Sequence, residues 1–131
     1  MNIIEQHFLD LKRIDKLSLL INSRWIGKAY PENTNLNIRL NCKFEQIDNK
    51  IIGFMDVDDE GEILIIKLEG GIVQLPFLIF DYFSTNPLIT NYGRIMYEIN
   101  DNWTELNGRV VGFSGERSLL VIAKHELTIE I

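Results

Sequence analysis

Few residues of the types that do chemistry occur in this sequence, and none belongs to a recognisable catalytic motif. The chain has two histidines, His7 and His125, and one cysteine, Cys42. A metal site built from His and Cys needs several ligands at a regular spacing. We therefore expect no metal site and no cofactor. Cys42 lies between Leu40 and Phe44 on an alternating apolar row, which favours a buried, unreactive thiol.

Two short segments resemble known site motifs, but each departs from its motif at a decisive position. The acids of Asp56–Gly61 follow the spacing of an EF-hand calcium loop, yet Lys67 stands where a bidentate glutamate closes that loop. The run Gly112–Glu116 resembles the Gly-x-Ser-x-Gly nucleophile elbow, but it ends in glutamate and a strand is predicted to follow instead of a helix. We interpret both segments as hairpin turns.

Carboxylates are the remaining candidates for catalysis. Paired carboxylates do acid–base work when burial separates their pKa values. Four of them lie along two late hairpins, at turns or on polar faces: Glu98, Asp101, Glu105 and Glu116. We interpret these four as solvated. Because no nucleophile–base pair is recognisable either, the sequence predicts a protein that is not an enzyme.

The charge is acidic and unevenly placed. The net charge is −6; residues 1–24 carry four bases and three acids, and the rest carry nine bases and sixteen acids. A nucleic-acid-binding surface needs the opposite sign, so we expect no nucleic-acid partner. An acidic surface attracts basic proteins and accelerates their association. The candidate partner-binding residues are Asp56, Asp58, Asp59, Glu60 and Glu62.

The apolar stretches indicate neither export nor a membrane span. The longest, Ile63–Ile66 and Leu75–Phe80, are too short to cross a bilayer. Charged residues occupy the N-terminal segment where a signal peptide needs an apolar core. A single cysteine fits a reducing compartment. We expect a cytoplasmic protein.

The N-terminal segment has the period of a helix. Ile4, Phe8, Leu11 and Ile14 recur on one helical face. This spacing predicts a helix from about residue 3 to residue 20, with a stop near residues 22 and 23. We assign residues 1–22 to this helix and residues 24–131 to a second part of the same single domain.

After Arg24 the period changes to two, which is typical of strands with one buried face. Leu36, Ile38, Leu40, Cys42 and Phe44 form the clearest buried row. Turn signals, among them Gly70-Gly71, divide the rest. The predicted strands are 24–30, 36–45, 51–57, 63–69, 72–83, 92–99, 103–114 and 118–131. We predict a mainly β fold, an antiparallel meander of about eight strands that forms a closed or nearly closed barrel.

One predicted strand is apolar on both faces. Phe77, Ile79 and Phe83 alternate with Leu78, Phe80 and Tyr82. Such a strand is either covered by the N-terminal helix or forms an interaction surface. Pro76 beside it predicts an edge position or a bulge. The protein is then a monomer or a dimer formed through that edge.

The opening of the meander resembles the calycin-like barrels, the lipocalin and fatty-acid-binding group. Those proteins begin with a glycine and an aromatic on the first strand, and here Trp25 and Gly27 open the segment 24–131. The order differs from the Gly-x-Trp of lipocalins, and the N-terminal helix is atypical. The resemblance implies a barrel around a central cavity and carries over no binding residue.

Two functions remain open. The first is a non-enzymatic interaction protein, such as an inhibitor or immunity-type protein that binds a basic partner through its acidic β-surface. The second is a barrel that binds a small apolar ligand, with polar anchors among Arg39, Arg94 and Arg109. A ligand-sized cavity would favour the second function, and a filled barrel with an acidic face would favour the first.

Overall fold

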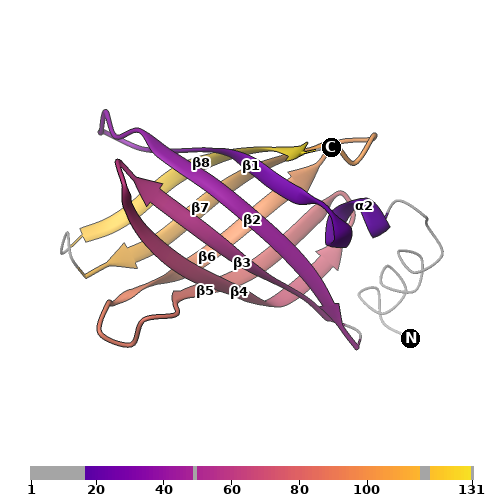
Figure 1. Ribbon diagram of the computed structural model, residues 1–131, viewed down its shortest axis with the longest axis horizontal. Helices are drawn as coiled ribbons and strands as arrows, with labels where there is room; N and C mark the ends of the chain where they lie inside the picture. The colour runs from indigo at the N-terminus through magenta and orange to yellow at the C-terminus, as the bar shows by residue number, and fades with distance from the viewer. Residues whose placement is uncertain (1–16, 49, 116–118, 131) are drawn as a thin grey trace.

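Eight consecutive antiparallel strands close into a barrel in the order of the sequence (Figure 1). The structure is a computed structural model, and it describes residues 17–48, 50–115 and 119–130. Its elements are α2 (Leu17–Asn22), β1 (Arg24–Pro31), β2 (Ile38–Ile47), β3 (Lys50–Asp59), β4 (Glu62–Gln74), β5 (Phe77–Ser84), β6 (Asn91–Ile99), β7 (Glu105–Ser114) and β8 (Leu119–Glu130). The predicted mainly β fold and its closed meander are confirmed.

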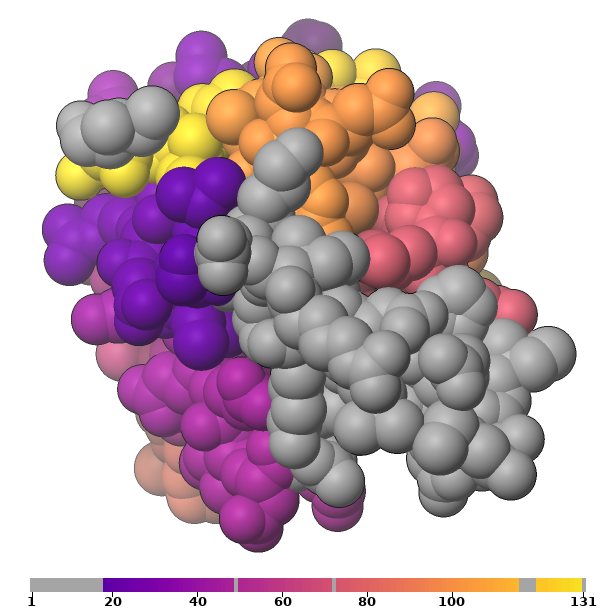
Figure 2. Space-filling view, turned by 90° about the vertical axis from the view of Figure 1, so that its right-hand side faces the viewer, coloured from indigo at the N-terminus to yellow at the C-terminus, as the bar shows by residue number. Residues whose placement is uncertain are grey.

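The helix α2 lies at one end of the barrel and packs against β2 (Figures 1 and 2). The indole nitrogen of Trp25 donates a hydrogen bond of 3.1 Å to the carbonyl oxygen of Leu20, which ties α2 to β1. The helix ends at Asn22, where the sequence predicts a stop. The earlier part of the predicted helix, residues 3–16, lies outside the described residues.

The described helix α2 is too short to cross a membrane. No helix within residues 17–48, 50–115 and 119–130 is long and apolar enough to cross a bilayer.

The two-residue alternation positions the core. In β2, Ile38, Leu40, Cys42 and Phe44 are buried, while the residues between them are exposed or half-buried. The same alternation repeats in β7, because successive side chains of a strand point to opposite faces. A barrel of eight strands has an interior just wide enough for side chains or for one small ligand.

The predicted hairpin turn at Gly70-Gly71 is wrong. These glycines lie inside β4, and the pairing of β4 with β5 shifts register between Glu69 and Ile72. Gly70 has a φ of +67°, a conformation that glycine adopts without strain, so the pair forms a β-bulge. The chain reverses instead at Leu75 and Pro76, and β5 starts at Phe77. Pro76 therefore lies in a turn and not within a strand.

The barrel leaves no edge strand among the eight. β1 pairs with β8 over eight residue pairs, from Arg24 with Glu130 to Pro31 with Ala123. Each of the eight strands is paired on both sides. The apolar residues of β5 divide as their alternation predicts: Leu78, Phe80 and Tyr82 point inward, and Phe77, Ile79 and Phe83 are half-buried on the outside.

Candidate functional site

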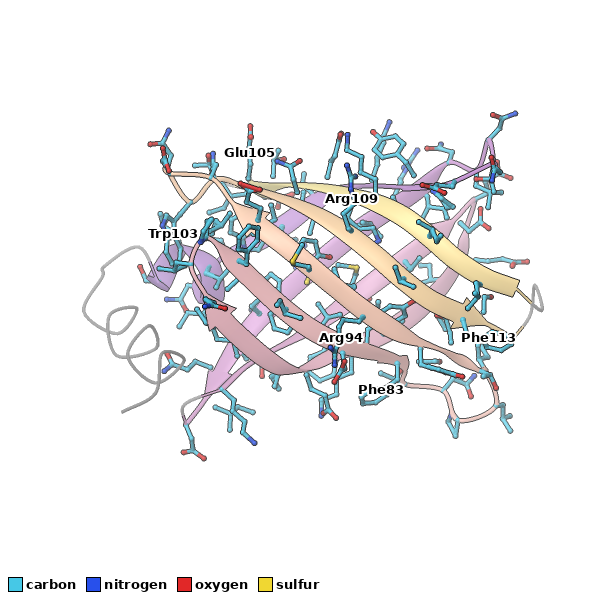
Figure 3. All side chains as sticks on the ribbon, turned by 180° about the vertical axis from the view of Figure 1, so that it is seen from behind. Phe83, Arg94, Trp103, Glu105, Arg109 and Phe113 are labelled. Carbon is cyan, nitrogen blue, oxygen red and sulfur yellow. The ribbon has the colours of Figure 1, made fainter. Side chains whose placement is uncertain are left out.

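The barrel is filled with large side chains at the end near α2 and hollow at the other end. Trp25, Phe44, Phe80 and Tyr97 are fully buried or nearly so, and Trp103 closes the same end (Figure 3). Toward the opposite end the inward positions carry smaller residues, and a cavity of about 530 Å³ opens there. This volume is in the range of small-molecule sites.

The cavity wall is mostly aliphatic, with a few polar side chains. Its buried apolar lining includes Ala29, Ile38, Ile66, Ile95, Val110 and Ala123. Tyr82, Ser114 and His125 also line it, and each of these polar side chains is less than a tenth exposed. We call Tyr82, Ser114 and His125 the polar wall.

His125 is fixed by a tyrosine from a neighbouring part of the sheet. The hydroxyl of Tyr97 on β6 lies 2.9 Å from Nδ1 of His125 on β8. Between them, Gly108 on β7 pairs with both residues in the ladder. A Cβ at Gly108 would lie 2.6 Å from Cδ1 of Tyr97, so the absence of a side chain there gives the tyrosine ring its path to the histidine.

This contact determines which ring nitrogen of His125 carries the proton. Burial raises the pKa of Tyr97 well above its ordinary value, with a further contribution from Cys42, so the hydroxyl stays protonated. If Nδ1 donated, the Tyr97 proton would lack an acceptor in a fully buried position. Tyr97 therefore donates to Nδ1, and the neutral ring carries its proton on Nε2.

The Nε2 atom of His125 faces the cavity. Among the described residues, no buried side-chain nitrogen or oxygen lacks a hydrogen-bond partner. The hydrogen bond at Nδ1 is the only one that the side chain of His125 makes within this part of the chain. Nε2 is thus reachable from the cavity and is available as a donor. Burial lowers the pKa of His125 to about 4, so this donor is uncharged at neutral pH.

Tyr82 and Ser114 present hydroxyl groups to the same cavity. The ring of Tyr82 crosses Gly93 and Gly112, where a Cβ would collide with it. Burial raises the pKa of Tyr82 to about 12, so it remains a neutral phenol. Neither hydroxyl makes a side-chain hydrogen bond within the described residues, and neither is sealed from the cavity. Both can bond to a guest molecule.

The structure distributes the predicted partner-binding acids over the hairpin of β3 and β4. Asp59 and Glu62 line the mouth of the cavity together with Glu32. Glu60 is exposed at the turn between β3 and β4, where Asp58 accepts a hydrogen bond of 2.8 Å from the backbone N–H of Gly61.

Asp56 and Asp58 lie on the outer wall, around a shallow depression that also contains Lys28 and Arg39. The acids of this depression thus have basic neighbours. The segment 56–61 forms the end of a strand and a hairpin turn, as its sequence predicts.

The three predicted anchor arginines point away from the cavity. Arg39, Arg94 and Arg109 are all exposed, and Figure 3 shows Arg94 and Arg109 on the outer surface. Each follows an inward residue by one position, so alternation places it outside. Arg94 forms an ion pair of 3.0 Å with Asp81 on β5. The polar groups inside the barrel come from other residues.

The other residues that the sequence offered as reactive groups are a buried cysteine and exposed carboxylates. Cys42 is fully buried, and desolvation, followed by the charge of Asp56, raises the pKa of its thiol. Glu98, Asp101 and Glu105 are exposed, which confirms that these carboxylates are solvated. Glu116 and His7 lie outside the described residues.

Ser114 and His125 do not form a nucleophile–base pair. His125 pairs with Gly108 on β7, and Ser114 stands six positions further along that strand. At the rise of an antiparallel strand this corresponds to about 20 Å. General-base activation needs hydrogen-bond contact, which this separation does not allow.

The polar wall was not predicted, although the sequence contains one signal of it. The inward positions toward the open end are small, with Ala29, Ala123 and Ser114 where the other end has Trp25 and Phe44. A change from large to small along the inward rows indicates an unfilled end. No protein-family model and no curated protein matches this sequence.

Proposed function

We propose that this protein binds a small, mainly apolar molecule inside the open half of its barrel and is not an enzyme. The observation that carries the proposal is the cavity itself, which combines aliphatic walls with buried polar groups that have unused hydrogen-bonding capacity. The free polar atoms are reachable from the cavity, so a guest that bonds to them can replace the water that they otherwise bind. The calycin-like opening of the sequence leads to the same expectation.

Two neighbouring residues of β7 provide a matched test of this proposal. Val110 is 4% exposed and lines the cavity, whereas Val111 is 58% exposed on the outside. We expect the uncharged fluorescent probe N-phenylnaphthylamine to bind the wild-type protein. Val110→Phe fills part of the cavity and should weaken binding roughly tenfold or more, about 1.4 kcal/mol. Val111→Phe should leave binding unchanged. Absence of binding, or equal loss in both variants, would refute the proposal.

The interaction-protein hypothesis remains the alternative prediction. Its five carboxylates divide between the outer wall, a turn and the cavity mouth, and Arg39 and Lys28 adjoin two of them. A basic partner would have to contact the mouth and the outer wall together. Pulldown from the native cell distinguishes the two functions: a basic protein favours this alternative, and a co-purifying small molecule favours the binding barrel.

A further inference from the structure

The charges around the cavity restrict the ligand that the proposed function requires, and this inference rests on that function. No lysine or arginine is among the described residues that line the cavity, and its mouth carries Glu32, Asp59 and Glu62. A carboxylate ligand would pass these acids and then lose its water without gaining a counter-charge. Burying an unpaired charge is far more costly than burying a neutral polar group.

The deepest polar group of the cavity is a neutral hydrogen-bond donor. His125 is 6% exposed, Tyr97 occupies its Nδ1, and its Nε2 points into the cavity. A carbonyl or hydroxyl oxygen is the natural partner for such a donor. Because the ring is held in position by Tyr97, the donor is oriented before any ligand arrives.

The polar wall lies on one side of the cavity. Tyr82 belongs to β5, Ser114 to β7 and His125 to β8, and they stand at successive heights along the β7 ladder. Below Asp59 and Glu62 at the mouth, the inward residues of β2, β3 and β4 that line the cavity are aliphatic, among them Ile38, Val57 and Ile66. A ligand that fits both sides is elongated and mainly hydrocarbon.

We infer that the ligand is an elongated, uncharged molecule whose leading carbonyl or hydroxyl oxygen accepts a hydrogen bond from Nε2 of His125, and that the cavity rejects fatty-acid carboxylates. The oxygen is held at the bottom of the cavity, and the hydrocarbon chain extends toward the mouth. The hydroxyls of Tyr82 and Ser114 can bond to further oxygens on the same edge of the molecule.

Competition among molecules of equal chain length tests this inference. Octane, n-octanol, methyl hexyl ketone and octanoate are each used at neutral pH to displace N-phenylnaphthylamine from the wild-type protein. The ketone and the alcohol should compete about fivefold better than octane, as expected for one hydrogen bond. Octanoate should compete at least roughly a hundredfold worse than the alcohol.

Variants of His125 assign the effect to its ring. In His125→Leu the ketone should lose its advantage over octane, while binding of octane itself shows that the cavity is intact. His125→Gln keeps an N–H group and should retain part of the advantage. Val111→Ala, on the exposed outer face of β7, should leave it unchanged.

Two kinds of failure are distinguishable in this series. If no member displaces the probe, the proposed function fails. If octane or octanoate competes as well as the ketone, or if His125→Leu keeps the full advantage, the cavity binds ligands but the inference about His125 is overturned.

Discussion

The hydroxyl of Tyr97 and Nδ1 of His125 are 2.9 Å apart, although 28 residues separate them in the chain. Their contact crosses a whole strand, because Gly108 on β7 has no side chain to intervene. The pair lies where the filled half of the barrel meets the cavity. It therefore contributes to the core and, through Nε2, to the site.

Removing the Tyr97 hydroxyl should destabilise the protein. Tyr97→Phe leaves Nδ1 of His125 without a partner in a buried position, which costs about 1–3 kcal/mol. Denaturant unfolding measures this loss. The matched control is Tyr92→Phe, at a residue that is 55% exposed and should change stability by less than about 0.5 kcal/mol. Equal effects of the two variants would show that the hydrogen bond contributes nothing.

The stability of the folded protein should decrease as the pH is lowered, because of the titration of His125. Its pKa is lowered from 6.5 to about 4 in the folded state. Between these values the unfolded chain binds the proton and the folded protein does not, so protonation favours unfolding as the pH falls. The contribution is complete above the unfolded pKa of 6.5 and is lost as the pH approaches 4. The loss amounts to about 3 kcal/mol.

Unfolding curves over this pH range test the assignment to His125. The slope of stability against pH should be smaller in His125→Gln than in the wild-type protein, whatever the absolute stability of the variant. Carboxylates that titrate in the same range contribute equally to both proteins. Parallel curves would mean that the ring is protonated as readily in the folded state as in the unfolded one.

Gly108→Ala should be destabilising because of its distance to Tyr97. The added Cβ would lie 2.6 Å from the tyrosine ring, and relieving such an overlap inside a packed core costs about 1–3 kcal/mol. A double variant with Tyr97→Leu removes the obstructed ring. Its destabilisation should be smaller than the sum of the two single changes. Simple additivity would contradict a direct collision between these residues.

The turn between β6 and β7 should depend on one asparagine side chain. Oδ1 of Asn100 accepts hydrogen bonds from the backbone N–H groups of Thr104 and Glu105, at 2.8 and 2.9 Å. Its Nδ2 donates to the Thr104 hydroxyl at 2.9 Å. Asn100→Ala should therefore cost about 1–2 kcal/mol. The exposed Asn102, changed to alanine, is the control and should have little effect on the thermal midpoint.

The fold could be predicted from the sequence wherever one face of a strand is apolar. In the predicted row from Leu36 to Phe44, the residues from Ile38 onward form the inner face of β2, and Leu36 lies before the strand. The glycine pair at 70 and 71 was misread, because glycine permits both a turn and a bulge. The choice between them depends on Val73, which is buried and pairs with Leu78 on β5. That pairing is a tertiary contact that no local pattern shows.

The sequence predicted what kind of site to expect, but not which residues form it. A barrel with an interior cavity follows from strand number and from the calycin-like opening, but the volume depends on which inward rows meet at the same height. His125 and Tyr97 become neighbours through the register of three strands. The arginines that the sequence offered as anchors differ from inward residues by one position, and a one-residue uncertainty in register reverses the face.

Closure of the barrel has a consequence for how the molecule assembles. Seven of the strand pairings connect neighbours along the chain, whereas the pairing of β1 with β8 joins residues about a hundred positions apart, such as Ile26 and Thr128. Bringing such distant segments together costs chain entropy before any contact rewards it. The pairing of β1 with β8 should therefore form late in folding. Until residue 130 has been added, the sheet has two unpaired edge strands. The growing polypeptide is most prone to aggregate in that interval.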